Sequence, residues 1–371
     1  MEILLEELYK TDIILEKFHF RKLFLETPTY KSDSFSKDKV LISATSYQIN
    51  GITQSGKTKL IKNYLLGLKK SSYLYIDCMD LRIDIDELNK TLFDFCNKYK
   101  ISTLVLDNYT PEIKIVNVPQ LLICSEVHHE IDFLTSVKLY PLDYEEFLAY
   151  EHKYDSTALN HFFKLGAFPS MHKISSDERV LYLQKTLKNA LTPMELDILI
   201  FCTKMMAQKL SPYSIYERLK QTKKISKDKL YSTFEALSSK GYIHQLQKTN
   251  HPKAIRKIYL CDISLKSALT IDKQFSKLFE NMIYLELLKS NSEAFYDDGI
   301  DFYLPSSDEV ILGMPFADER TLFKKMEAIE AFLFAYQIKK VTAITMSTEG
   351  SMSHPLSLVE MIPFDIWAIG D

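Results

Sequence analysis

The sequence predicts an α/β fold that begins with a parallel sheet flanked by helices and continues into further segments of mixed structure. From about residue 40 to 150, short apolar runs alternate with stretches of helical periodicity, a pattern typical of parallel sheets. The chain has only nine glycines, and two of them fall in one Gly-x-x-x-x-Gly-Lys-Thr motif. Residues 209–259 hold twelve Lys or Arg against three acids, although the whole chain carries a net charge of −3.

The composition is that of an ordinary globular protein. Hydrophobic residues make up 46% and charged residues 26% of the 371 residues, which excludes wholesale disorder and suggests two to three domains of roughly 150 residues. The sequence contains no run of about 18 apolar residues, so it predicts no membrane-spanning helix. The acidic start, Met1–Glu7, is unlike a secretory signal, and five widely spaced cysteines favour reduced thiols. We therefore expect a cytoplasmic protein that does not engage a membrane.

The first α/β segment is assigned to residues 36–150, after an N-terminal helical segment over residues 1–35. Its helices are predicted at Lys57–Leu68 and Ile85–Tyr99. Its strands are short apolar runs, each bounded by polar or turn residues. We expect strands at Tyr47–Ile49, Tyr73–Ile76, Leu104–Leu106, Leu121–Ile123 and Val137–Leu139.

The Gly-x-x-x-x-Gly-Lys-Thr motif (a Walker A motif) predicts a phosphate-binding loop between the first strand and the first helix. Its glycines let the backbone wrap closely around a phosphate, so that the amide N–H groups point inward. The helix that begins near Lys57 adds the partial positive charge of its N-terminus, and Lys57 is expected to reach the β- and γ-phosphates of ATP. The predicted nucleotide contacts are Gly51, Ile52, Thr53, Gln54, Ser55, Gly56, Lys57 and Thr58.

A second set of residues is expected to hold Mg²⁺ and the attacking water. The Thr58 hydroxyl would ligate Mg²⁺, and Asp107, at the end of an apolar strand, would hold the ion's water shell. In many ATPases a glutamate directly follows this acid in the sequence. Here Asn108 takes that position, and an amide can orient water but cannot accept its proton. The predicted catalytic residues are Lys57, Asp107 and Asn108, with slow turnover. Ser125 ends a further strand and either senses the γ-phosphate or caps the next turn.

Three segments are predicted after residue 150. Residues 151–191 are expected to form a helical lid, interrupted by Gly166–Pro169. Residues 192–262 show three helical patterns and then two short strands, which predicts a winged helix. Residues 263–371 are expected to form an α/β domain, with helices near Phe275–Leu288 and Leu322–Tyr336 and strands at Val341–Met346 and Leu358–Ile362.

The basic segment is the predicted contact with a polyanion. Its last helix is expected to begin after Ser226, which is suited to cap it, and to stop at Gly241. The outward face of this helix and the wing that follows would contact double-stranded DNA through Lys227, Tyr231, Lys253, Arg256 and Lys257. The alternatives are a solvated basic face or a wing that docks a protein.

Four stretches carry a family pattern in the same order along the chain. Tyr47–Leu60 contains the phosphate loop, and Val137–Leu148 is similar to an L-x-P-L-S-F-x-E-F segment. Phe163–Pro169 is similar to a G-G-(F/L)-P turn, and Phe279–Leu287 to an F-E-N-x-V-x-x-E-L helix. Together they resemble the archaeal-type AAA+ ATPases related to the STAND class. The resemblance implies a P-loop NTPase core with a helical lid, then a winged helix, then a restriction-endonuclease-like α/β domain.

The chain departs from that family where hydrolysis and cleavage would occur. Family members have Asp-Glu where this chain has Asp107-Asn108. Their nuclease-like domain carries Glu-x-Asp-Phe and then a strand with Glu-x-Lys. Here the first motif reads Gly299-Ile300-Asp301-Phe302, with glycine in place of the glutamate, and the strand Val310–Met314 is apolar where the second belongs. Asp301 and Glu280 do not suffice to hold Mg²⁺ for cleavage, and Glu280 is interpreted as a structural ion pair or a cap.

The sequence thus predicts a nucleotide-controlled switch that binds ATP and Mg²⁺, hydrolyses ATP weakly and associates with DNA. A protein partner or a second copy of the chain would be its further partners. The alternative is a protein-interaction scaffold whose nucleotide is structural and is never turned over. An active Mg²⁺-dependent nuclease is disfavoured because the carboxylate and lysine of its second motif are missing.

Overall fold

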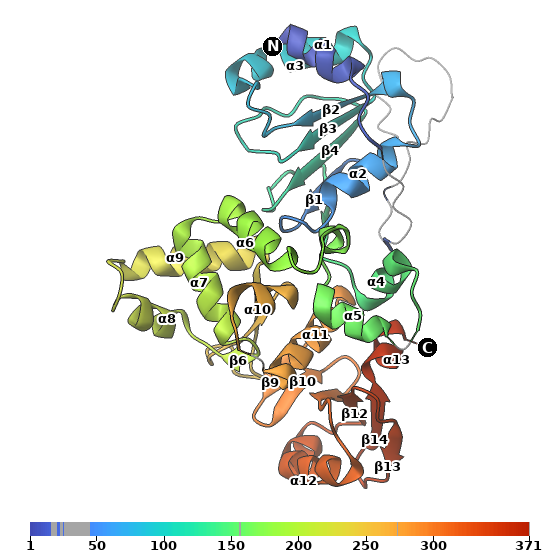
Figure 1. Ribbon diagram of the computed structural model, residues 1–371, viewed down its shortest axis with the longest axis vertical. Helices are drawn as coiled ribbons and strands as arrows, with labels where there is room; N and C mark the ends of the chain where they lie inside the picture. The colour runs from blue at the N-terminus through green and yellow to red at the C-terminus, as the bar shows by residue number, and fades with distance from the viewer. Residues whose placement is uncertain (16–20, 23–24, 26–44, 156, 273, 371) are drawn as a thin grey trace. The chain divides into compact units, whose positions relative to one another are not determined.

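The computed structural model describes residues 1–15, 21–22, 25, 45–155, 157–272 and 274–370, which fall into two compact units, Met1–Tyr140 and Pro141–Asp371 (Figure 1). Of the N-terminal helical segment expected over residues 1–35, the described part contains one helix, α1 (Glu2–Lys10). It ends because Thr11 adopts an extended conformation, with its hydroxyl donating to the carbonyl of Glu7 at 2.7 Å. Most of the remaining segment lies outside the described residues.

The first unit is built on a five-stranded sheet in the order β2-β3-β4-β1-β5, in which all neighbouring strands run parallel. This confirms the predicted parallel α/β class. The register places Asp77 beside Asp107 and Asn50 beside Ser125, so polar residues gather at the carboxyl ends of four adjacent strands. The strands are β1 (Tyr47–Asn50), β2 (Tyr73–Asp77), β3 (Thr103–Asp107), β4 (Gln120–Ser125) and β5 (Thr135–Lys138).

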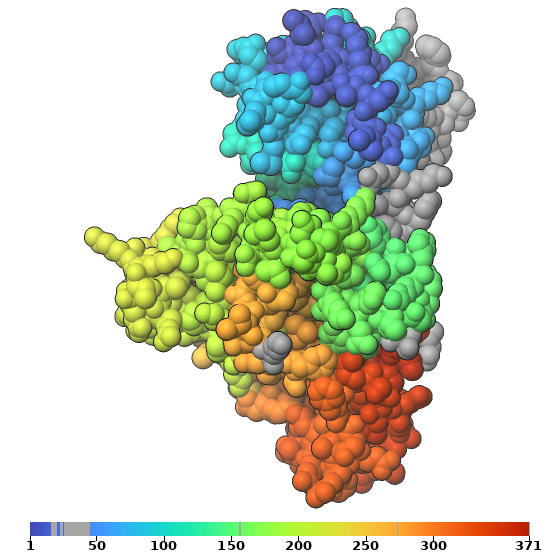
Figure 2. All heavy atoms as spheres, viewed as in Figure 1, coloured from blue at the N-terminus to red at the C-terminus, as the bar shows by residue number. Residues whose placement is uncertain are grey.

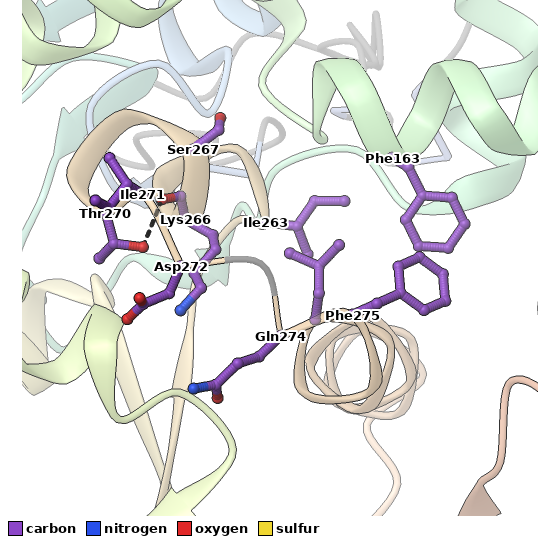
Figure 3. A pocket seen from close by; sticks show the side chains of 10 residues that line it. Phe163, Ile263, Lys266, Ser267, Thr270, Ile271, Asp272, Gln274 and Phe275 are labelled. Carbon is purple, nitrogen blue, oxygen red and sulfur yellow. Dashed lines mark hydrogen bonds between the residues drawn. The ribbon is translucent and has the colours of Figure 1, made fainter.

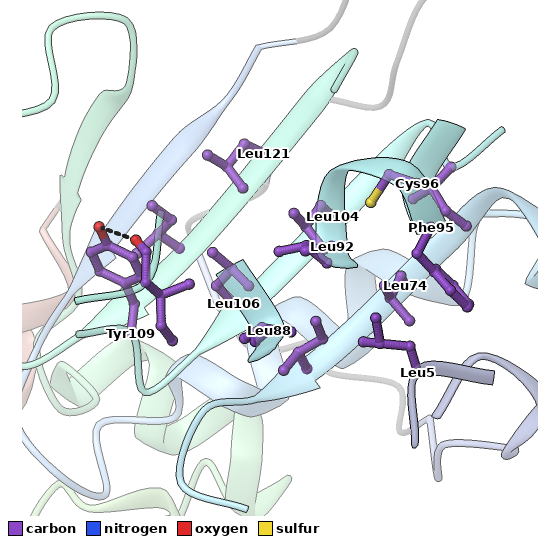
Figure 4. Packing of buried hydrophobic residues seen from close by; sticks show 14 residues of the cluster. Leu5, Leu74, Leu88, Leu92, Phe95, Cys96, Leu104, Leu106, Tyr109 and Leu121 are labelled. Carbon is purple, nitrogen blue, oxygen red and sulfur yellow. Dashed lines mark hydrogen bonds between the residues drawn. The ribbon is translucent and has the colours of Figure 1, made fainter. Parts of the chain in front are cut away.

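Helices cover both faces of this sheet, and the alternation of side chains along the strands creates a core on each face. Helices α1 and α3 (Ile85–Lys98) pack on one face, and α2 (Lys57–Leu65) packs on the other. The first core, drawn in Figure 4, includes Leu5, Leu74, Leu88, Leu92, Leu104, Leu106 and Leu121. The second includes Ile49, Leu60, Ile61, Leu65, Val105, Leu122 and Cys124. The two cores hold the loop between β1 and α2 at the edge of the sheet where the strands end.

The second unit begins with helical segments broken where the sequence predicted a break. Gly166 has φ +72°, and a Cβ there would lie 2.2 Å from a carboxylate oxygen of Asp262. The other oxygen of Asp262 accepts from the amide of Ala167 at 2.6 Å, so a buried carboxylate holds a turn that only glycine permits. The segments are α4 (Tyr144–Glu151), α5 (Ala158–Leu165), η2 (Pro169–Lys173) and α6 (Arg179–Ala190).

Residues 192–262 contain three helices and a three-stranded antiparallel sheet in the order β6-β8-β7. Ser226 caps the last helix by accepting from the amide of Lys229 at 3.2 Å, and Gly241 ends it with φ +89°, both as predicted. In the space-filling view this segment forms a lobe at one side of the second unit (Figure 2). The elements are α7 (Pro193–Lys204), β6 (Gln208–Lys209), α8 (Pro212–Leu219), α9 (Lys227–Lys240), β7 (Ile243–Leu246) and β8 (Lys257–Leu260).

The remainder of the second unit is a mixed six-stranded sheet, in the order β13-β14-β12-β11-β10-β9, with helices around it. Its helices are α10 (Ser264–Leu269), α11 (Phe275–Lys289), α12 (Glu319–Ala335) and α13 (Phe364–Ile369). Its strands are β9 (Phe295–Asp297), β10 (Ile300–Leu304), β11 (Glu309–Gly313), β12 (Lys340–Thr345), β13 (Gly350–Met352) and β14 (Leu358–Pro363). Within the described ranges, no helix combines the length and apolarity that a membrane crossing requires.

A pocket of about 650 Å³ opens among α5, α10 and α11 (Figure 3). Phe163 and Phe275 pack against each other in its wall, with ring centroids 5.1 Å apart. Its buried lysine, Lys266, points its ammonium to the backbone carbonyl of Thr203 at 3.4 Å. Apolar contact therefore dominates the chemistry of this pocket.

Candidate functional site

The predicted phosphate loop connects β1 to α2 at the carboxyl ends of the strands. A Cβ at Gly51 would lie 2.3 Å from the carbonyl oxygen of Leu139, so this close approach requires glycine. The loop turns through two left-handed residues, Gln54 (φ +73°) and Gly56 (φ +96°), and Gly56 is the N-cap of α2. The start of the loop is held by the amide of Gly51, which donates to the carbonyl of Ser125 at 3.2 Å. The backbone therefore wraps around the N-terminus of a helix, as an anion site requires.

The ammonium of Lys57 lies inside this loop. It is 8% exposed and donates to the carbonyl oxygens of Gly51 at 2.7 Å and Ile52 at 2.9 Å. Burial lowers the pKa of Lys57, and the nearby carboxylates of Glu126 and Asp107 oppose that shift. The hydrogen bonds that the described residues make to this buried cation come from backbone carbonyls, so an anionic acceptor would bind it more strongly.

Thr58 and Asp107 meet at the start of α2. The Thr58 hydroxyl donates to Asp107 Oδ2 at 2.6 Å, and the Tyr75 hydroxyl donates to the same oxygen at 2.7 Å. Burial and the Asp107 carboxylate raise the pKa of Tyr75, so the phenol keeps its proton and remains a donor. A hydroxyl beside a carboxylate is a set of hard oxygen donors that fits Mg²⁺. Among the described residues no three His, Cys, Asp or Glu side chains gather to hold a metal, so phosphates and water would have to complete its shell.

Asn108 is turned away from the loop. It has a left-handed backbone (φ +55°), and its side-chain amide donates to Asp77 Oδ1 at 2.9 Å. Its backbone amide donates to Asp107 Oδ1 at 3.0 Å, which fixes the orientation of that carboxylate. In this arrangement Asn108 positions Asp107 and bridges to β2, and its expected role in orienting water stays a prediction.

Ser125 lies at the end of β4 and is 4% exposed. Its hydroxyl donates to the carbonyl of Val127 and accepts from the side-chain amide of Asn50 at 3.0 Å. Of the two alternatives considered from the sequence, these bonds are those of a residue that caps the next turn. Contact between Ser125 and a γ-phosphate stays a prediction.

Two residues of this site, Arg21 and Glu126, were not predicted from the sequence. The guanidinium of Arg21, 3% exposed, donates to the carbonyl of Tyr140 at 3.0 Å and to the carbonyl of Ser55 in the phosphate loop. Glu126 accepts from both the amide and the hydroxyl of Thr53. Glu126 could have been suspected because it directly follows the polar end of a strand, whereas Arg21 lies far from the motif in sequence.

The predicted DNA contacts differ in exposure. Lys227 and Lys253 are exposed, and the Lys227 ammonium lies 5.5 Å from the ring centroids of both Tyr213 and Tyr231. Arg256 is partly buried and lies 3.4 Å from Gln245 Oε1. Several basic residues of the segment are paired with acids outside it: Lys209 and Lys248 with Asp298, Lys223 with Asp197, and Lys240 with Glu195. The local charge of the segment is thus partly neutralised.

The expectation that Lys257 contacts DNA is wrong, because this residue is buried at 9% exposure and its ammonium bonds to carboxylates. Lys257 Nζ lies 2.9 Å from Glu280 Oε1 and 3.5 Å from Asp301 Oδ1. Burial acts to lower the pKa of Lys257, but the two carboxylates outweigh it, so the pKa is raised. Tyr259 also donates to Glu280 at 2.9 Å, so Glu280 takes part in a buried ion pair, as interpreted from the sequence.

The comparisons with known proteins give distant similarities. No protein-family model matches the chain. The uncharacterized protein MJ1544 of Methanocaldococcus jannaschii is 21% identical over 86% of this chain and 87% of its own length. Among solved structures, the Walker-type ATPase PABY2304 of Pyrococcus abyssi is 14% identical with a TM-score of 0.41, covering 60% of this chain and 90% of its own. The Aeropyrum pernix ORC1 protein, solved in complex with DNA, is 12% identical with a TM-score of 0.32, covering 62% and 87%. None of these similarities identifies a function for this chain.

Proposed function

We propose that this chain is an ATP-binding switch of the P-loop type that uses Mg²⁺ and hydrolyses ATP slowly. One observation carries the proposal: Lys57, Thr58 and Asp107 meet at the N-terminus of α2, inside a loop that requires Gly51. A buried cation, an inward-wrapped backbone and a hydroxyl–carboxylate pair are the groups that a Mg²⁺-bound triphosphate needs. The chain contains no Asn-Lys-x-Asp motif, which argues against a GTPase of the Ras type.

Slow hydrolysis is proposed because the group after Asp107 is an amide. Asn108 is bonded to Asp77 and has no proton-accepting oxygen of carboxylate strength. The switch would arise from exchange of partners, since Lys57 and Thr58 are both bonded to groups of the protein that a nucleotide and its ion would replace. The resemblance to archaeal-type AAA+ and STAND-related ATPases, inferred from the sequence, agrees with this function.

The test is thermal unfolding of the full chain with and without ATP and Mg²⁺. A ligand at 100 times its Kd stabilises the folded state by about 2.7 kcal/mol through mass action. We expect the wild type to gain stability with ATP, and Lys57→Ala to lose this gain while keeping its nucleotide-free melting temperature. Lys69→Ala, an exposed lysine beyond α2, is the matched control and should behave as the wild type. Equal stabilisation of wild type and Lys57→Ala by ATP would refute the site.

The second part of the proposal is association with double-stranded DNA through residues 192–262. The order helix, strand, two helices and two strands in this segment agrees with the predicted winged helix and supports the proposal. Lys227 stands exposed at the first position of α9, and Lys253 is exposed between β7 and β8, where a wing would lie. Exposed lysines can contact DNA phosphates through charge attraction without a precisely shaped binding site. We propose that Arg256 and Tyr231, which are partly buried, contribute less to DNA binding on the same surface.

We also propose that the C-terminal sheet does not cleave nucleic acid. The resemblance implies a restriction-endonuclease-like domain, in which clustered carboxylates hold Mg²⁺. Here the Lys257 ammonium lies against Asp301, the carboxylate that remains of that motif, and against Glu280. The neighbouring strand β11 offers the backbone amide of Gly313, which donates to Asp301 at 3.0 Å, in place of a further carboxylate.

The alternative is a scaffold whose nucleotide is structural. Size-exclusion chromatography of the full chain with ATP and with ADP separates the two functions. A switch changes its hydrodynamic size or oligomeric state between the two nucleotides, and this would also reveal a second copy of the chain as partner. A scaffold elutes alike with both.

A further inference from the structure

Glu126 is placed at the phosphate loop by two anchored neighbours. It directly follows β4, which lies beside β1 in the sheet. On one side, Ser125 accepts from the side-chain amide of Asn50 at 3.0 Å. On the other, the carbonyl of Val127 accepts from the same amide at 2.5 Å. Asn50, the last residue of β1, thus bonds to the residues on both sides of Glu126. These two hydrogen bonds hold the backbone of Glu126 close to the loop.

The carboxylate of Glu126 bonds to donors of the loop itself. Its Oε1 accepts from the backbone amide of Thr53 at 3.1 Å and from the Thr53 hydroxyl. Thr53 is the third residue of the phosphate-binding motif, whose amides serve to cradle anions. Glu126 thus supplies one negative charge to a loop built to receive negative charge. In the same arrangement Lys57 is bonded to the carbonyls of Gly51 and Ile52.

We infer that Glu126 is an internal anion that competes with the nucleotide for the phosphate loop, a role that rests on the proposed ATP site. For a triphosphate to bind, the Thr53 donors must exchange a carboxylate for phosphate oxygens. The carboxylate must also move away, since two anions at one set of donors repel each other. The chain therefore binds nucleotide more weakly than the same loop would without Glu126. Binding also displaces the Glu126 side chain, which follows the end of β4.

The test is the affinity of the full chain for MgATP, measured by isothermal titration calorimetry. Glu126→Gln keeps the shape of the side chain and removes its charge, and Glu126→Ala removes the competitor altogether. Because a hydrogen bond to a charged group and a like-charge repulsion are both lost, we expect both variants to bind ATP about five- to tenfold more tightly. Glu130→Gln, an exposed glutamate four residues further on, is the matched control and should bind as the wild type.

The outcomes separate this inference from the proposed function. If the wild type binds ATP, Lys57→Ala does not, and the Glu126 variants bind no more tightly than the wild type, the competing role of Glu126 is overturned and the ATP site stands. If the Glu126 variants keep the wild-type affinity and lose ATP turnover, Glu126 acts on the attacking water instead, and the inference is again overturned. If no form of the chain binds ATP, both the site and the inference fail. Melting temperatures of all variants without nucleotide show that each is folded.

Discussion

Asn108 and Asp77 join the ends of two neighbouring parallel strands: the Asn108 side-chain amide donates to Asp77 Oδ1 at 2.9 Å. Asp77 is the register partner of Asp107 across β2 and β3. The residue that stands where many ATPases have a glutamate is therefore engaged with a second carboxylate. An amide satisfies this position, because it donates to Asp77 and tolerates the left-handed backbone at φ +55°.

The first prediction is that Asn108→Glu lowers stability. Glutamate would place a carboxylate against Asp77 and would adopt the left-handed conformation at a penalty of about 1–2 kcal/mol. The double variant Asp77→Asn/Asn108→Glu removes the repulsion and should recover part of the loss. Thermal unfolding measures both effects. In the double variant we expect faster phosphate release from ATP, since a carboxylate can accept the proton of the attacking water. Turnover unchanged in a folded double variant would show that another group limits hydrolysis.

The second prediction concerns the buried pair of Lys257 and Glu280. Lys257→Met takes the shared cation away from two buried carboxylates, although Glu280 keeps the Lys277 ammonium at 2.8 Å, so the second unit should lose about 3 kcal/mol of stability. Lys257→Met/Glu280→Gln removes both charges and should be less destabilised than the sum of the single variants. Chemical denaturation of the four proteins gives the coupling free energy. Additive effects would show that the ion pair contributes nothing beyond packing.

A third prediction follows from His172, which is buried beside Glu151. Burial lowers the pKa of His172, although its bond to the Glu151 carboxylate opposes the shift. In the unfolded chain a histidine takes up its proton near pH 6.5, while folded His172 does so only at lower pH. As the pH falls below about 6.5, the unfolded state binds more protons, and stability declines until the folded pKa is passed.

His172→Gln removes this titration, so its melting temperature should fall less than that of the wild type between pH 7.5 and pH 5.5. His251→Gln changes an exposed histidine and serves as the control. Differential scanning calorimetry at several pH values gives the comparison. If His172→Gln follows the wild-type pH dependence, the buried imidazole is not the group responsible.

The fourth prediction tests DNA association. Binding of duplex DNA to the full chain should weaken steeply with salt, with a slope of roughly 0.9 for each phosphate neutralised. Lys227→Glu/Lys253→Glu should weaken binding to all sequences alike and reduce that slope. Lys69→Ala changes an exposed lysine of the first unit and should leave DNA affinity unchanged. Fluorescence anisotropy at several salt concentrations measures each. Binding that is absent at low salt, or insensitive to salt, would favour the protein-docking alternative.

The parallel sheet and the phosphate loop could be predicted from the amino-acid sequence, because both depend on local patterns. Buried parallel strands are continuous apolar runs, so β2, β3 and β4 are visible in the sequence, and Gly51 and Gly56 stand where the loop's close approach and left-handed turn demand them. Ser226 and Gly241 likewise mark the ends of α9 through bonds to residues a few positions away. Such features need no knowledge of distant parts of the chain.

Which charged side chains contact one another follows from the three-dimensional arrangement of the elements and could not be predicted from the sequence. Lys257 is one of twelve basic residues in its segment, and nothing local distinguishes it from an exposed lysine, yet β8 places it against Glu280 and Asp301. The contact of Glu126 with Thr53 arises because β4 lies beside β1, an order that follows from strand pairing across 75 residues. Side-chain partners that come from different elements depend on how the sheet is ordered, and a periodic pattern of apolar residues specifies burial without specifying that order.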